Sequence, residues 1–385
     1  MTNAQLEVSR LLADRATRTI LCCGSGGVGK TTTAAALALR AAEQGRTVCV
    51  LTIDPARRLA QSLGLVELDN TPREVAGVDP SAGGRLDAMM LDMKSTFDEL
   101  VLSHTDGPRA KEILSNPFYQ SLSSSFAGTQ EYMAMEKLGQ LRRDAADTGR
   151  WDLIVVDTPP SRSALDFLDA PQRLGSFLDG RFIRLISAPT RAGGRAYLKV
   201  MNAGMSVLAS TVAKVLGAAL LQDVQAFLAA METMFGGFRE RADETYRLLQ
   251  NAETAFLVVA TPERDALREA SFFVDRLSAD RMPLAGLVLN RLHQERPGSV
   301  GPAEAVALAD ELDASTTPAD LGRRLTADLL RLRAAGLQLA AREQRQVNRF
   351  TALHPDVNIA RAPALAGDVH DLDGLRPVAA ALTQR

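Results

Sequence analysis

Cysteine and aromatic residues are scarce in this sequence of 385 residues, and neither charge sign is in clear excess. The three cysteines, Cys22, Cys23 and Cys49, fall in apolar segments that we expect to be buried strands. They are therefore interpreted as small core residues rather than as metal ligands or disulfides. The net charge of −2 provides no overall attraction for nucleic acid or for an anionic membrane. We expect no nucleic-acid partner and a reducing, cytoplasmic location.

Long apolar segments are also missing. The most apolar stretch, Val207 to Leu221, is only 15 residues long and contains Ser210, Thr211 and Lys214. A helix that spans a bilayer needs about 20 apolar residues. The segment after Met1 has neither the apolar core of a signal peptide nor the composition of a transit peptide. The sequence therefore predicts no integral membrane segment.

Hydrophobic residues nevertheless make up 46 % of the chain, which is enough for a large buried core. They are concentrated in short β-rich segments separated by helical stretches, a pattern typical of an α/β protein with a mostly parallel sheet. Strands of this kind are buried on both faces, and ligands bind at their C-terminal ends. The predicted strands are Thr19 to Cys23, Thr47 to Ile53, Leu86 to Leu91, Leu153 to Val156, Thr254 to Ala260, Leu284 to Leu289 and Val357 to Ala360.

A glycine-rich loop, Gly-Ser-Gly-Gly-Val-Gly-Lys-Thr-Thr over residues 24–32, links the first strand to an alanine-rich helical segment. Its glycines let several backbone N–H groups converge on phosphate oxygens at the N-terminus of a helix. Lys30 adds a positive charge, and the Thr31 hydroxyl can reach Mg²⁺. The sequence thus predicts a P-loop that binds a nucleoside triphosphate with Mg²⁺, and the family resemblance described below implies ATP or ADP. The expected phosphate-binding residues are Gly26, Gly27, Val28, Gly29, Lys30, Thr31 and Thr32.

Two carboxylates end predicted strands next to this loop. Asp54 follows the second strand, and Asp157 follows four apolar residues in the manner of a Walker B strand. Mg²⁺ prefers oxygen ligands and often keeps part of its hydration shell. We expect Thr31, Asp54 and Asp157 to hold this ion.

The region between Lys94 and Gln250 contains a single predicted strand, and helical periodicity fills the rest. We interpret it as a helical subdomain inserted in two parts into a P-loop NTPase sheet flanked by helices. The predicted division is nucleotide-binding domain 1–93, helical subdomain 94–150, nucleotide-binding domain 151–170, helical subdomain 171–252 and nucleotide-binding domain 253–385.

Two apolar helix faces lie in the second helical part. Leu198 to Ala219 and Leu221 to Met234 carry apolar residues at spacings of three and four. Either these faces pack against each other and the core, or they form an adaptable, Met-rich groove for an apolar protein segment.

The loop sequence Gly-Gly-Val-Gly-Lys-Thr-Thr resembles the deviant Walker A loop of cell-division and partition ATPases, nitrogenase iron protein, arsenical-pump ATPases and GET-pathway targeting ATPases. That class usually has a signature lysine before the Gly-Gly pair, which reaches the partner's nucleotide across a dimer. Ser25 occupies this position and cannot supply a cation. Either another cation replaces it, with Arg57, Arg58 and Arg162 as candidates, or the dimer is asymmetric.

The segment Thr52 to Gly64 is similar to the first switch of the arsenical-pump and GET-targeting family. The resemblance implies that Gln61 stands where the targeting branch has a water-activating Asp. An amide orients water but is a weak base. The expected catalytic residues are thus Lys30, Asp54, Gln61 and Asp157. In the second switch, after Asp157, this chain departs from the family pattern at Arg162, Ser163 and Asp166.

Further resemblance to this family lies near the C-terminus and in Gly128 to Glu136. It implies an adenine site at Asn290, Arg291, Pro363, Ala364 and Leu365, although a strand-end Asn can also simply cap a turn. Glu131 and Glu136 match the helix that couples the subdomain to a dimer partner in this family. A solvated acidic helix face is the competing interpretation.

The resemblance implies a Mg²⁺-dependent ATPase that cycles between open and closed dimers. Because Ser25 lacks the trans cation, we expect a heterodimer with a paralogous ATPase subunit rather than a homodimer. The helical subdomain would bind an apolar client segment or a partner. The alternative is a slow or non-hydrolysing adaptor that responds to nucleotide. A partition ATPase is disfavoured because Pro377 to Arg385 shows no amphipathic anchor.

Overall fold

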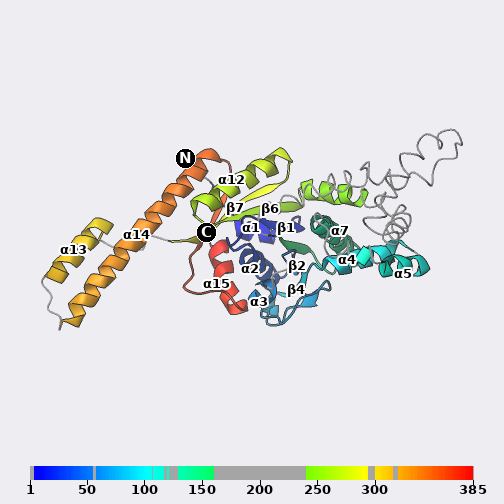
Figure 1. The fold of residues 1–385 in the computed structure, drawn as a ribbon, viewed down its shortest axis with the longest axis horizontal. Helices are drawn as coiled ribbons and strands as arrows, with labels where there is room; N and C mark the ends of the chain where they lie inside the picture. The colour runs from blue at the N-terminus through cyan, green and yellow to red at the C-terminus, as the bar shows by residue number, and fades with distance from the viewer. Residues whose placement is uncertain are drawn as a thin grey trace, which may run out of the picture.

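The computed structural model describes residues 4–54, 58–105, 107–116, 119–120, 129–159, 240–293, 300–314 and 320–384. A sheet of eight strands runs through its centre, in the order β3-β4-β2-β5-β1-β6-β7-β8 (Figure 1). All neighbouring strands are parallel except the edge pair β3 and β4. The strands are β1 Thr19–Cys23, β2 Thr47–Thr52, β3 Arg73–Glu74, β4 Arg85–Met90, β5 Leu153–Asp157, β6 Thr254–Ala260, β7 Leu284–Leu292 and β8 Ile359–Pro363.

The predicted α/β fold with a mostly parallel sheet is confirmed, and all seven predicted strands are present. Only β3 was not predicted, because two exposed residues carry no alternating apolar pattern. The helices are α1 Val8–Ala13, α2 Lys30–Glu43, α3 Arg58–Ser62, α4 Met93–His104, α5 Gly107–Ser115, α7 Thr129–Thr148, α12 Arg264–Ala279, α13 Pro302–Ala314, α14 Leu321–Leu353 and α15 Leu372–Thr383.

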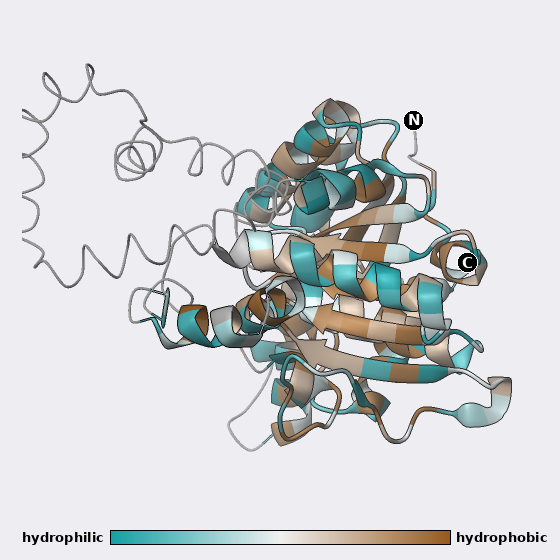
Figure 2. Cartoon of the chain, turned by 90° about the vertical axis from the view of Figure 1, so that its right-hand side faces the viewer, coloured by the Kyte–Doolittle hydropathy of each residue, from teal (hydrophilic) through white to brown (hydrophobic). Residues whose placement is uncertain are grey.

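Both faces of the sheet are covered, which explains why the strands are apolar at successive positions. Along β1, Ile20 and Cys22 pack with α1, α2 and α15, whereas Leu21 and Cys23 pack with α7 and α12 on the other face. Figure 2 shows the apolar strands enclosed between helices. The three cysteines are free thiols and are buried, as predicted for small core residues.

The alanine-rich helix α2 lies against the centre of the sheet. Its buried residues include Ala34, Ala35, Ala36, Ala38, Ala41 and Ala42. Because these side chains are small, the helix axis can approach the strands closely. The helix thereby brings its N-terminus, at Lys30, to the C-terminal ends of β1 and β5, where the candidate site lies.

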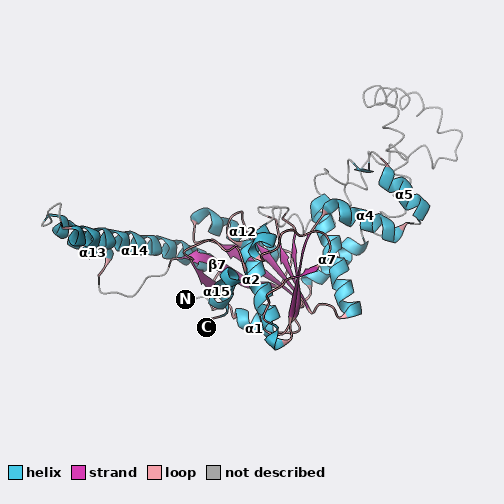
Figure 3. Cartoon of the chain, turned by 90° about the horizontal axis from the view of Figure 1, so that it is seen from below, coloured by secondary structure: helices cyan, strands magenta, loops and turns pink. Residues whose placement is uncertain are grey.

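Helices α13 and α14 form a hairpin that reaches away from the sheet (Figures 1 and 3). Only the C-terminal part of α14 joins the core, through Val347 and Phe350. These two helices fall in the part of the chain that the sequence assigns to the nucleotide-binding domain, 253–385, and no separate hairpin was predicted there.

Part of the predicted helical region lies outside the described residues. The apolar faces Leu198 to Ala219 and Leu221 to Met234 lie outside the described residues, as does Val207 to Leu221. Among the helices that the structure describes, none combines the length and the apolarity that crossing a bilayer requires.

Arg46 links the segments that precede the central strands through hydrogen bonds of its guanidinium group. It is almost fully buried, and its guanidinium donates hydrogen bonds to the carbonyl oxygens of Leu12, Asp14, Thr17 and Asp152. Its Nε also donates to Asp152 Oδ1 at 2.7 Å. These bonds join the segments before β1, β2 and β5 at the edge opposite the site.

We predict that Arg46→Ala lowers the free energy of unfolding by about 3 to 5 kcal/mol, because it leaves buried acceptors without donors. The matched control is Arg15→Ala, since Arg15 binds the same carboxylate from an exposed position. This control should cost less than about 1 kcal/mol. Urea titrations measure both values, and equal losses would contradict the assigned role of Arg46.

Candidate functional site

The glycine-rich loop joins β1 to α2 at the C-terminal edge of the sheet. Gly27 and Gly29 have φ values of 78° and 93°, in the left-handed region that favours glycine. A Cβ atom on Gly29 would lie 2.2 Å from Asn290 Nδ2, so a larger residue here would have to displace the Asn290 side chain as well as adopt a strained backbone. The Asn290 Nδ2 atom donates a hydrogen bond to the Val28 carbonyl at 2.9 Å. The end of β7 therefore holds the loop in place.

Lys30 begins α2 and is largely buried. Its Nζ donates to the Ser25 carbonyl at 2.8 Å, so the ammonium group folds back across the loop. Burial lowers the pKa of Lys30, and the nearby Asp157 and Asp54 carboxylates oppose that effect. A positive group held in this position is suited to bind phosphate oxygens.

Asp157 ends β5 and is completely buried. Its Oδ2 accepts hydrogen bonds from the Thr31 hydroxyl at 2.8 Å and from the Thr52 hydroxyl at 2.9 Å. Its Oδ1 has no hydrogen-bond partner among the described residues. Burial raises the pKa of Asp157 to about 6, although the two hydroxyl bonds act in the opposite direction.

This donor set fits Mg²⁺. The three expected metal-binding residues, Thr31, Asp54 and Asp157, converge at one end of the sheet and offer only oxygen atoms. A buried carboxylate oxygen without a protein partner is a costly group unless a cation or water completes it. Asp54 also lies 3.9 Å from the Arg58 guanidinium.

A cavity of about 380 Å³ opens above the loop. It brings together residues that the sequence placed in the site from three separate segments. Gln61 lies on α3, across the cavity from Lys30, and Arg58 is exposed at the same edge. The predicted residues that line the cavity are Gly27, Gly29, Lys30, Thr31, Thr32, Asp54, Gln61 and Arg291.

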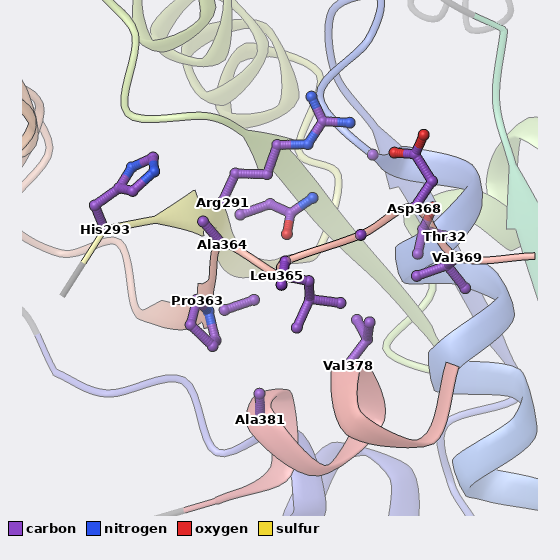
Figure 4. Close-up of a pocket in the computed structure, with 15 residues that line it drawn as sticks. Thr32, Arg291, His293, Pro363, Ala364, Leu365, Asp368, Val369, Val378 and Ala381 are labelled. Atoms are coloured by element: carbon purple, nitrogen blue, oxygen red, sulfur yellow. The ribbon is translucent and has the colours of Figure 1, made fainter. Parts of the chain in front are cut away.

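A second cavity of about 460 Å³ adjoins the first, since Gly29, Thr32, Arg291, Asp368 and Val369 line both. In Figure 4, Arg291 and Asp368 lie above this cavity, and Val378 and Ala381 of α15 lie below it. The residues expected to surround adenine meet here although they come from distant segments. They are Asn290, Arg291, Pro363, Ala364 and Leu365.

Two polar side chains at this second cavity, those of Asp368 and His293, were not among the residues expected to bind the nucleotide. Asp368 lines both cavities, and His293 lines the second. His293 is held by Glu343 of α14, because its backbone N–H donates to Oε2 at 2.8 Å and its Nδ1 lies 2.7 Å from Oε1. No local motif reveals a contact between residues 50 positions apart. The left-handed backbone of Arg291, with φ 56°, also gives no sequence signal.

Glu136 does not have the position that the sequence suggested. Its carboxylate is buried, accepts hydrogen bonds from Arg241 at 3.0 and 3.1 Å, and lies 3.5 Å from Arg143. It is therefore neither a contact for a dimer partner nor part of a solvated acidic face, because it is buried and paired with Arg241 of the same chain. The Glu131 side chain and the candidates Arg57, Arg162, Ser163 and Asp166 lie outside the described residues.

The sheet order, the glycine-rich loop at a helix N-terminus and the buried strand-end carboxylate define a P-loop nucleotide-binding protein. Comparison with protein families then gives a narrower assignment. The protein-family model described as "Anion-transporting ATPase" matches residues 17–303 of the sequence, and the chain belongs to this family.

Curated relatives agree with this assignment. "ATPase GET3" of Podospora anserina is 28 % identical over 291 residues, which cover 75 % of this chain and 77 % of the relative. "ATPase GET3" of Malassezia globosa is 25 % identical and covers 76 % and 78 %. "Protein Rv2184c" of Mycobacterium tuberculosis is 34 % identical over a shorter stretch, 42 % of this chain and 39 % of the relative. The predicted resemblance to arsenical-pump and GET-type ATPases is confirmed.

The raised pKa of Asp157 predicts a pH effect on stability in the absence of Mg²⁺ and nucleotide. Between about pH 4 and about pH 6 the unfolded chain releases this proton while the folded chain retains it, so stability falls as pH rises. Above about pH 6 both states are ionised and the loss is complete. The loss is at most about 3 kcal/mol.

Asp157→Asn should remove this contribution. The difference in free energy of unfolding between wild type and this variant is then expected to change between pH 4 and pH 7. Glu67→Gln, which alters an exposed acid, controls for the loss of one charge. A wild-type-minus-variant difference for Asp157→Asn that is constant with pH would contradict the buried, protonatable carboxylate.

Proposed function

We propose that this chain is a Mg²⁺-dependent ATP hydrolase. The observation that carries the proposal is that Lys30, Thr31 and Asp54 line one cavity, with the buried Asp157 carboxylate bound to the Thr31 hydroxyl behind them. The adjoining cavity, lined by the residues expected to surround adenine, supports the proposal. Two of the relatives are named as ATPases, which supports ATP hydrolysis as the reaction. The proposed compartment is the cytoplasm, where the free thiols of the chain stay reduced.

Each site residue has a role that follows from its chemistry. Backbone N–H groups of residues 26–32 and the Lys30 ammonium bind the phosphate oxygens. Thr31, Asp54 and Asp157 would hold Mg²⁺, which neutralises phosphate charge when it is bound. Gln61 orients the attacking water through its amide, and Asp54 fixes neighbouring waters through its carboxylate.

The base would occupy the second cavity. Asn290 lies at its inner end beside Gly29, and Pro363, Ala364 and Leu365 supply apolar surface. Asp368 stands where the two cavities meet, at the position expected for a ribose between base and phosphates. Its carboxylate can accept hydrogen bonds from ribose hydroxyl groups.

A second candidate function is a nucleotide-dependent adaptor with little turnover. The neutral amide of Gln61 favours it, because an amide cannot remove a proton from water. In either case we propose that the nucleotide state switches a dimer between open and closed forms. The helical subdomain would then bind or release an apolar client segment.

We predict that the purified chain releases phosphate at saturating ATP only when Mg²⁺ is present. Lys30→Ala should lower ATP affinity at least about 100-fold, because it removes a charge-assisted contact worth roughly 3 kcal/mol. Lys94→Ala, in an exposed lysine of α4, is the matched control and should bind normally. Calorimetry measures affinity, and unaltered affinity of Lys30→Ala would contradict the site. Binding without phosphate release would favour the adaptor.

The dimer partner is proposed to be a paralogous subunit with a lysine at the position of Ser25. If a missing trans cation limits turnover, Ser25→Lys should raise ATP hydrolysis by the chain alone at least about tenfold, since such cations are worth much more in related enzymes. Ser25→Ala is the control and should have no effect. A chain that is fully active alone and unaffected by Ser25→Lys or by an added paralogue would exclude this pairing.

A further inference from the structure

The hairpin of α13 and α14 carries an exposed row of leucines on its longer helix. Each of them is between 40 % and 76 % exposed, which is unusual for five large apolar side chains on one helix. We call this row the leucine seam. It consists of Leu321, Leu325, Leu329, Leu332 and Leu339.

The leucine seam occupies a narrow face of α14. At 100° per residue its members fall within an arc of about 80°. The spacings of four, four, three and seven are those of a heptad pattern. Val347 and Phe350 fall in the same arc further along the helix, where they are buried in the core. The same face is thus packed at one end of α14 and exposed at the other.

The opposite side of α14 is already covered. The buried residues of the hairpin there are alanines, which let the two helices lie close together, and they are Ala305 and Ala309 on α13 with Ala327 and Ala334 on α14. Among the described elements, α14 makes its main helix contacts with α13 and, near its C-terminal end, with α12. Figures 1 and 3 show the hairpin standing clear of the sheet.

Positive charge borders the leucine seam. Arg324 and Arg342 lie on one side of the arc and Arg333 lies on the other. Two acids lie close to the arc: Asp328, beside it and 3.9 Å from the Arg331 guanidinium, and Glu343, within it at the packed end, where it binds His293. The whole of α14 contains seven arginines and two acidic residues. Arg323 is paired with Asp320, and Arg331 with Asp310 and Asp313, so an acidic partner would meet the flanking charges of Arg324, Arg333 and Arg342.

This charge pattern disfavours a second copy of the chain as the occupant. Two copies packed antiparallel through the same seam would place the flank that carries Arg324 and Arg342 against the same flank of the other copy. Like charges at the flanks of a helix pair oppose association. The shape disfavours a lipid surface, because an interfacial helix usually has a broader apolar face with aromatic residues and the seam has leucine alone.

We propose that the leucine seam is a docking site for an α-helix of another protein, one with leucine-type residues at heptad spacing and acidic flanks. The two helices would pack side by side as in a coiled coil. The family match ends at residue 303, so nearly the whole hairpin lies beyond the part that the chain shares with the family model. This binding activity is separate from the nucleotide site.

The test uses two synthetic peptides of three heptads with leucine at positions a and d. One carries glutamate at e and g, and the other carries lysine. Fluorescence anisotropy with the full chain should show binding of the glutamate peptide, at least tenfold weaker binding of the lysine peptide, and weakening by salt. Equal affinity for both peptides, or no binding of the glutamate peptide, would overturn the proposal.

Substitutions on α14 test whether the glutamate peptide binds at the leucine seam. Leu325→Glu and Leu332→Glu should each weaken the glutamate peptide at least tenfold, and both replace exposed residues, so folding is retained. Leu353→Glu is the matched control, because this leucine is 72 % exposed on the same helix but lies outside the arc. Equal effects of all three substitutions would contradict the seam. Lys30→Ala should bind the peptide with normal affinity. Peptide binding can therefore be tested independently of the proposed ATPase function.

Two further measurements decide between occupants. In sedimentation experiments on the chain alone, Leu332→Glu should leave the oligomeric state unchanged. Vesicles rich in phosphatidylglycerol should not capture the chain through Leu332. Either result in the opposite direction would replace the proposed helix with a second copy or a lipid surface.

Discussion

The buried carboxylate of Asp157 is the constraint around which the candidate site is organised. It receives the hydroxyl groups of Thr31 from the glycine-rich loop and Thr52 from the neighbouring strand, and thereby fixes three segments relative to each other. The charge is expensive to bury, which raises its pKa, and its second oxygen lacks a partner among the described residues. A cation at this point would remove both costs, so the proposed Mg²⁺ site and the stability of the folded chain would depend on the same group.

A second constraint lies at the end of β7. Asn290 donates a hydrogen bond to the loop carbonyl of Val28, and its amide lies where a side chain at position 29 would begin. Beyond it, His293 is attached to Glu343 of α14. One strand end therefore supports the loop, lines the cavity proposed for the base and anchors the projecting hairpin. The parallel sheet and the hairpin that carries the proposed docking surface are joined at this place.

Local signals explain what the sequence could predict. The strands, the loop and the strand-end acids Asp54 and Asp157 each depend on neighbouring residues, and parallel topology brings their C-terminal ends together. Contacts between distant segments were not predictable. Glu136 was misassigned because its partner Arg241 lies more than 100 positions away. The projecting hairpin was not predicted, because its pattern of leucine, alanine and arginine is equally typical of a helix packed on the core.

The most direct test of the central claim is a crystal structure of the chain with Mg²⁺ and ADP. The expected result has phosphates on the backbone of residues 26–32, the metal beside Thr31 and Asp157, and the base between Asn290 and Leu365. Asp157 Oδ1 should then have a metal-bound water or the ion itself as its partner. A nucleotide bound elsewhere, or an Asp157 without a metal or water partner in the presence of bound Mg²⁺ and ADP, would contradict this assignment.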